Sequence, residues 1–131
     1  MRVILGINAY HADSSACIVV NGKLIAAVEE ERINRKKHFS GYPIESVREC
    51  LRIAKIKGED ITDVAFNTKP KSNFFPKISF LDKNFSFKRE NLTNRIKKKV
   101  NLDKILKKNI KLNKKVKFHF VEHHLSHLAS A

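Results

Sequence analysis

Three short apolar segments within the first 28 residues restrict the fold more than any other feature of the sequence. Residues 2–7 read Arg-Val-Ile-Leu-Gly-Ile, residues 15–20 read Ser-Ala-Cys-Ile-Val-Val, and residues 23–28 read Lys-Leu-Ile-Ala-Ala-Val. Asn21-Gly22 separates the last two, and this dipeptide is typical of a type I′ turn because both positions need positive φ. The first segment is apolar on both faces, as central strands are. The sequence therefore predicts an antiparallel three-stranded opening.

A helix and two further strands are expected after this sheet. Pro43 suits a first helical turn, and apolar residues recur at helical spacing over about 43–56, with Gly58 ending the helix. Residues 61–66 read as a fourth strand, and the crossover is long enough for parallel pairing. Residues 116–121, Val-Lys-Phe-His-Phe-Val, read as a buried or edge strand.

A histidine cluster follows the last expected strand. If a helix begins at Glu122, His123 and His127 stand at i and i+4 on one face, while His124 points elsewhere. Two imidazoles in that arrangement can take adjacent positions on one metal ion. Two histidines do not complete a metal site, so a polar helix start with solvent-facing histidines is the alternative interpretation.

Two polar segments near the N-terminus are candidates for binding. The loop over residues 8–15 concentrates His11, Asp13, Ser14 and Ser15. Small hydroxyl residues let backbone amides approach an anion, and an aspartate can orient a metal or water, although a polar turn with local hydrogen bonds is the alternative. The charged segment 29–38 carries four basic residues that can meet a phosphate or carboxylate, or pair with the preceding glutamates on a wet surface.

The positive charge of the chain is concentrated in one internal segment. The net charge is +14, and residues 68–115 hold sixteen Lys or Arg against three Asp or Glu. Phenylalanines interleave with lysines there, a pattern that can bind single-stranded nucleic acid. Apolar residues farther along predict one or two basic helices (Leu92, Ile96, Ile105, Leu106 and Ile110). We interpret the segment as a basic helical insertion, with a small nucleic-acid-binding module as the alternative.

The remaining composition indicates the compartment. No apolar run approaches the roughly 20 residues that a membrane-spanning helix needs. Cys17 and Cys50 are two isolated thiols and do not form a disulfide framework. We therefore expect a cytoplasmic protein that does not enter a membrane.

The order of the expected elements is that of an α/β fold, the ribonuclease-H-like half-domain of the actin-like ATPase superfamily, and this is an analogy at fold level. In open α/β sheets, ligands bind at the carboxyl ends of the strands. We therefore expect His11 and Asp13 to face His123 and His127 across one cleft.

Four motifs in the same order resemble the N-terminal part of the NodU/CmcH carbamoyltransferase family. They are Gly6-Ile-Asn-Ala-Tyr-His-Ala-Asp-Ser-Ser-Ala16, Val28-Glu-Glu-Glu-Arg32, Arg35-Lys-Lys-His38 and Val121-Glu-His-His-Leu-Ser-His-Leu-Ala-Ser-Ala131. The resemblance predicts that residues 1–131 are the N-terminal part of a carbamoyltransferase domain, with a core over 1–67 and 116–131 and the basic insertion over 68–115.

The resemblance implies an O-carbamoyltransferase. A C-terminal YrdC-like domain would make carbamoyl adenylate from carbamoyl phosphate and ATP, and the present domain would pass the carbamoyl group to a hydroxyl of a small molecule. It also implies roles for individual residues. These are a divalent metal, with Fe²⁺ expected, on His123 and His127, carbamoyl transfer by His11, Asp13 and Lys37, and binding of the donor by Ser14, Ser15 and His38.

The family resemblance also sets expectations about completeness. The chain stops inside the last motif, so we expect a truncated fragment that lacks the C-terminal half and the YrdC-like domain and is inactive alone. Threonylcarbamoyl-tRNA synthesis proteins share the fold and a similar HxxxH, and they are a further alternative. Their usual opening lacks the arrangement of His11 and Asp13.

Overall fold

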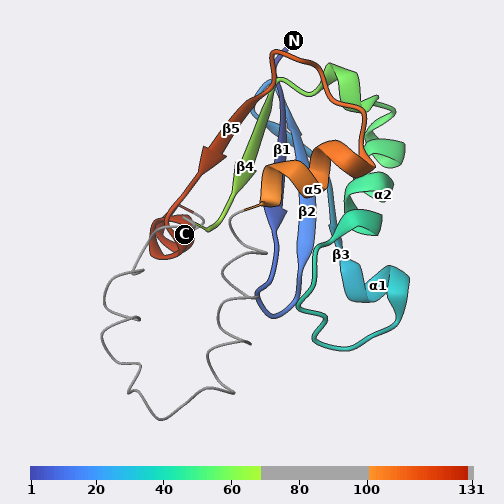
Figure 1. Ribbon diagram of the computed structural model, residues 1–131, viewed down its shortest axis with the longest axis vertical. Helices are drawn as coiled ribbons and strands as arrows, with labels where there is room; N and C mark the ends of the chain where they lie inside the picture. The colour runs from blue at the N-terminus through green and yellow to red at the C-terminus, as the bar shows by residue number, and fades with distance from the viewer. Residues whose placement is uncertain (69–100, 130–131) are drawn as a thin grey trace.

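A computed structural model describes residues 1–68 and 101–129 of the chain (Figure 1). These residues form one five-stranded mixed sheet in the order β3-β2-β1-β4-β5, with helices packed around it. In chain order the elements are β1 (Val3–Asn8), β2 (Ser15–Val20), β3 (Lys23–Glu29), α1 (Glu30–Asn34), α2 (Ile44–Ala54), the 3₁₀ turn η1 (Gly58–Asp60), β4 (Asp63–Phe66), α5 (Leu102–Asn109), β5 (Lys117–Phe120) and α6 (His123–Leu128). The α/β class is confirmed.

The antiparallel half of the sheet agrees with its prediction from sequence. β1 pairs antiparallel with β2, and β2 pairs antiparallel with β3. Asn21 and Gly22 have φ values of 48° and 83°, so both turn positions lie in the left-handed region that a type I′ turn requires. The Asn21 side chain also accepts a hydrogen bond from the backbone N–H of Arg2, 2.9 Å away, which ties the turn to the start of β1.

The parallel half of the sheet is built on the other side of β1. β4 pairs parallel with β1, and β5 pairs parallel with β4. β1 therefore lies in the middle of the sheet, as its apolar sequence predicts, and β5 lies at an edge. Because parallel strands point the same way, the carboxyl ends of β1, β4 and β5 meet at one edge of the sheet.

Helix α2 begins after Pro43 as expected but ends earlier than its sequence predicts. Lys55 follows Ala54 in the left-handed conformation, with φ 55°, and its N–H bonds the carbonyls of the last turn. The prediction that Gly58 ends the helix is wrong, because Gly58 begins the separate turn η1. A Cβ at Gly58 would lie 2.6 Å from both the Ile110 side chain and the Lys111 carbonyl, so close chain approach requires the glycine.

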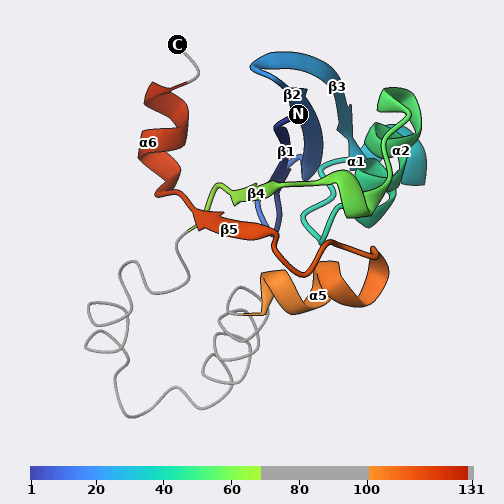
Figure 2. The same cartoon turned by 90° about the horizontal axis from the view of Figure 1, so that it is seen from above.

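One face of the sheet is covered by α2 and α5, and the hydrophobic core lies between them and the strands (Figures 1 and 2). Helix α5 lies inside the segment predicted as an insertion, and it confirms one of the expected basic helices. Its Leu102 and Leu106 are fully buried, and Ile110 joins the same core. The boundary at 68–115 stays a prediction, but the described end of that segment shares the core of the domain. The interleaved phenylalanines lie outside the described residues.

A buried carboxylate links α1 to the start of α2. The side chain of Glu30 accepts hydrogen bonds from the Ser46 backbone N–H at 2.7 Å and from the Ser46 hydroxyl at 2.8 Å. Pro43 at the N-cap position offers no side-chain cap, so Glu30 satisfies the first turn of α2 from outside the helix. The Glu30 backbone N–H also donates to the Ser14 carbonyl. The residue thus fixes both α2 and the loop between β1 and β2.

Helix α6 lies on the opposite side of β4 and β5 from α5 (Figure 2). It covers only the margin of the second sheet face. Burial alternates along β1 and β2, and their half-buried side chains lie on this second face. Among residues 1–68 and 101–129, we find no helix with the length and apolar character needed to cross a bilayer.

Candidate functional site

The histidines of α6 adopt the geometry that their spacing predicts. Glu122 caps the helix, since its carboxylate accepts from the Leu125 backbone N–H at 3.1 Å. The Nε2 atoms of His123 and His127 lie 3.0 Å apart, with the two rings perpendicular. His124 is exposed, and its ring lies edge-to-face with the His123 ring. The pair that shares a helix face is therefore also the pair whose nitrogens converge.

The loop between β1 and β2 reaches these histidines across the sheet edge. The His11 ring stacks on the His123 ring, with centroids 4.6 Å apart and an interplanar angle of 9°. Nε2 of His11 also lies 3.0 Å from the hydroxyl of Thr68, a buried residue just after β4. Residues from both ends of the chain thus meet at the carboxyl edge of the parallel strands, as the topology predicts.

The histidine pair fits two positions on one metal ion. Nitrogens about 2.1 Å from an ion and in adjacent octahedral positions are about 3.0 Å apart, which is the observed Nε2 separation. The same distance also fits an N–H···N hydrogen bond. Nδ1 of His123 is buried and has no hydrogen-bond partner among the described residues. Those residues bring no three His, Cys, Asp or Glu side chains together around one point, so a metal ion on this pair would need further donors.

Asp13 joins the loop to the charged segment after α1. Its carboxylate lies 3.2 Å from Nδ1 of His38, and both residues have φ in the left-handed region, at 59° and 52°. The His38 backbone N–H donates to the Glu31 carboxylate at 3.1 Å, which fixes the turn that also carries the exposed Lys37. Of the two loop residues expected to face the histidines of α6, His11 makes the stacked contact with His123, whereas Asp13 bonds His38 of the charged segment.

The two serines of the loop lie in different surroundings. Ser14 is 1% exposed, and its hydroxyl donates to the Gly41 carbonyl at 2.8 Å and lies 3.2 Å from the His11 carbonyl. These contacts of the Ser14 hydroxyl with backbone carbonyls fix the conformation of the loop. Ser15 begins β2 and lines a cavity on the other sheet face. A role for either in binding the donor stays a prediction.

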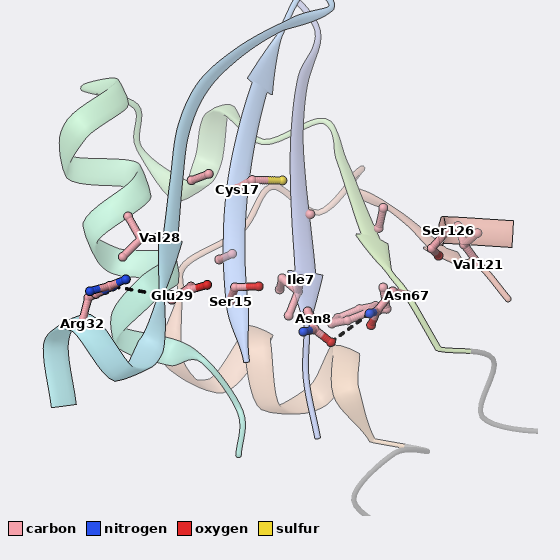
Figure 3. Close-up of a pocket in the computed structure, with 15 residues that line it drawn as sticks. Ile7, Asn8, Ser15, Cys17, Val28, Glu29, Arg32, Asn67, Val121 and Ser126 are labelled. Carbon is pink, nitrogen blue, oxygen red and sulfur yellow. Dashed lines mark hydrogen bonds and ion pairs between the residues drawn. The ribbon is translucent and has the colours of Figure 1, made fainter. Parts of the chain in front are cut away.

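A cavity of about 880 Å³ lies on the sheet face that α2 and α5 leave uncovered (Figure 3). Small side chains of the strands form its floor. At one end lies the ion pair of Arg32 and Glu29, 3.5 Å apart, and at the other Ser126 of α6. The sequence allowed the basic residues of segment 29–38 either to meet a ligand or to pair with the preceding glutamates. Arg32 does the second, because it pairs with Glu29.

Sequence reasoning missed the two asparagines of this cavity. The Asn67 side chain donates to the Asn8 side chain at 2.8 Å, and Asn8 in turn donates to the Asp13 carbonyl. Each asparagine stands at the carboxyl end of a parallel strand, β1 or β4. Polar residues at adjacent strand ends are a signal that could have found them.

Fold and site together define a mixed α/β domain whose loop histidine and helix histidines gather at the carboxyl edge of its parallel strands. The chain belongs to the carbamoyltransferase family, because the family model described as Carbamoyltransferase N-terminus matches residues 3–131. The match confirms the resemblance found in the sequence motifs. It also runs through the basic segment, so a separate nucleic-acid-binding module is not favoured.

The chain is similar to two curated relatives, of which it covers only a small part, and to one solved structure. It is 42% identical over 74 residues to the uncharacterized protein sll1178 of Synechocystis sp., covering 56% of this chain and 12% of that protein. It is 42% identical over 59 residues to the nodulation protein NolNO of Sinorhizobium fredii, covering 45% of this chain and 9% of that protein. YeaZ from Pseudomonas aeruginosa matches with a TM-score of 0.41 and 17% identity, over 53% of this chain and 30% of that one.

Proposed function

We propose that this domain carries the acceptor side of an O-carbamoyltransferase, where a carbamoyl group passes from carbamoyl adenylate to the hydroxyl of a small molecule. The observation that carries the proposal is the meeting of His11 with His123 and His127 at one sheet edge. Family membership supports carbamoyl transfer as the reaction. The ribonuclease-H-like half-domain belongs to the same proposal and is supported by the order of strands and helices.

His123 and His127 would hold a divalent metal, Fe²⁺ by the family resemblance, together with further donors. Such an ion supplies a Lewis acid for the oxygen that gains negative charge during acyl-like transfer. The helix itself keeps the two nitrogens together, because residues at i and i+4 share a face and Glu122 fixes the first turn. The protein thus needs no rearrangement to present two adjacent ligands.

His11 is the proposed general base. The acceptor oxygen forms a bond to the carbamoyl carbon, the bond from that carbon to the adenylate phosphate oxygen breaks, and AMP leaves. The proton of the acceptor hydroxyl passes to His11, because an imidazole nitrogen is a common general base in enzymes. Contact with Thr68 and stacking on His123 restrict the His11 ring, which lowers the cost of orienting it for the transfer.

The charged side of the loop would receive the donor. Lys37 lies exposed beside the pair of Asp13 and His38, and a lysine ammonium stabilises a leaving phosphate. Ser15, which lines the cavity, would also contact the donor. ATP and carbamoyl phosphate are then substrates of a YrdC-like domain that supplies carbamoyl adenylate, and the reaction takes place in the cytoplasm.

The experiment compares His127→Ala with His124→Ala in a full-length protein that joins this domain to the C-terminal half and the YrdC-like domain. Elemental analysis and transfer of radiolabelled carbamoyl groups are measured together. We expect His127→Ala to lose bound metal and transfer in parallel, and His124→Ala to keep both, because His124 lies off the converging face. Unchanged metal content in His127→Ala would reject the assignment of the ligand pair.

A further inference from the structure

A second histidine and a buried aspartate form a bonded pair away from the cluster. Nε2 of His119 on β5 lies 2.8 Å from the carboxylate of Asp63 on β4. Asp63 is 6% exposed, and it also accepts from the Thr62 hydroxyl at 2.8 Å and from the Arg2 guanidinium at 3.3 Å. The hydrogen bond from His119, followed by those from Thr62 and Arg2, lowers the pKa of Asp63 to about 2. The carboxylate is therefore ionised, and His119 donates to it.

This pair links the edge strand β5 to its neighbour β4. β5 has four residues and pairs only with β4 among the described strands. On its core side, Phe118 and Phe120 stack on Phe66, at centroid distances of 6.5 and 5.4 Å. His119 points to the other face. It stands opposite Ala65 in the register, and its bond reaches diagonally to Asp63, a cross-strand side-chain contact that favours this pairing over a shifted one.

The position of β5 determines the position of α6. Two residues, Val121 and Glu122, separate the strand from the helix, and the Val121 backbone N–H still bonds the Phe66 carbonyl at 2.8 Å. A shift of β5 by two residues would keep its faces but move α6 by about 6.6 Å. That displacement exceeds the 4.6 Å between the stacked rings of His11 and His123, so the cluster depends on the register of β5.

We propose that Asp63 and His119 are positioning residues for the histidine cluster: their bond fixes the register of β5 on β4 and thereby holds α6 where His123 stacks on His11. Neither residue touches the reacting atoms. The role of the cluster rests on the proposed function, but its geometry does not.

The test uses a matched pair of substitutions in the full 131-residue chain. His119→Gln keeps an N–H donor long enough to reach Asp63, whereas His119→Asn is polar but too short. His124→Gln serves as the control for removing a histidine near the cluster. Ring-proton NMR of the metal-free chain reports the stacking of His11 on His123 through upfield ring-current shifts. Titration with Co²⁺ alone reports the affinity of the cluster.

We expect His119→Asn to lose the upfield shifts and to bind Co²⁺ about tenfold more weakly, the lower end of the range for residues that orient metal ligands. His119→Gln and His124→Gln should keep both within twofold. Wild-type shifts in His119→Asn, or equal losses in His119→Gln and His119→Asn, would overturn the proposal.

Two further experimental outcomes distinguish a failure of this inference from a failure of the proposed function. If no variant and no wild-type chain binds Co²⁺, the proposed metal role fails, while the NMR shifts still decide the positioning role. Should His119→Asn fail to fold, long-range ¹H–¹⁵N spectra of the wild-type chain decide instead. They should show His119 with its proton on Nε2, because Asp63 accepts there. A proton on Nδ1 with none on Nε2 would refute the pairing.

Discussion

Replacing Glu30 by alanine should destabilise the domain far more than its place in a charged run suggests. The side chain is 3% exposed and accepts from the backbone N–H and the hydroxyl of Ser46. Alanine leaves both donors buried without the bonds that Glu30 accepts and removes the cap that Glu30 supplies to α2 from outside the helix. Unmade bonds to a charged group and a lost cap together cost about 3 kcal/mol.

Urea unfolding followed by circular dichroism measures this cost. For a slope of about 1.5 kcal/mol per molar urea, a loss of 3 kcal/mol lowers the midpoint by about 2 M. Glu30→Gln should cost only about 1 kcal/mol, because one amide oxygen can still accept both bonds from Ser46. The matched control is Glu45→Gln, which removes an exposed pairing with Arg48 and should cost at most about 0.5 kcal/mol.

A double-mutant cycle isolates the contact itself. Ser46→Ala should cost less in the Glu30→Ala background than in the wild-type chain, with a coupling of about 1–2 kcal/mol. A cost for Glu30→Ala no larger than that for Glu45→Gln, or zero coupling with Ser46, would show that Glu30 does not cap α2.

Two further predictions concern the core and the pH dependence of stability. Leu106→Ala should cost about 2–5 kcal/mol in urea unfolding, since Leu106 is fully buried, and a cost below 1 kcal/mol would show that α5 is peripheral. Asp63 has its pKa lowered from 3.8 to about 2, so the stability it contributes is present above pH 3.8 and is lost as the pH falls toward 2. Thermal unfolding between pH 2 and 5 should show this loss in the wild-type chain, and Asp63→Asn should flatten the pH profile. An unchanged profile would contradict the role given to the carboxylate.

The sequence predicts those features of the fold that depend on local chemistry. Asn21-Gly22 fixes a hairpin because few other residues tolerate positive φ at both turn positions. His123 and His127 share a face because helical spacing requires it. The approach of His11 to this pair follows from topology, since the loop after β1 and the end of β5 lie at the same sheet edge.

Other features depend on packing between segments far apart in sequence. Glu30 lies in a run of three glutamates that reads as a wet surface, and its burial depends on where α2 begins in space. Lys55 ends α2 although the sequence offers Gly58, and Gly58 instead lies where Ile110 and Lys111 approach the backbone closely. Helix α5 reads as part of a charged insertion, and only the tertiary structure shows that Leu106 enters the core.

The two outer strands of the described sheet, β3 and β5, differ in the features that affect pairing with a strand of another molecule. Along β3, Leu24 and Ile25 are 64% and 45% exposed, whereas the exposed residues of β5 are the polar Lys117 and His119. Charged and polar side chains discourage lateral association of sheets, and bulges do so by increasing local twist. An irregularity in the pairing of β2 with β3, beside Ile18 and Val19, supplies such a twist at the apolar margin. Polar side chains at β5 and increased twist at β3 thus each discourage the lateral association of this sheet with another.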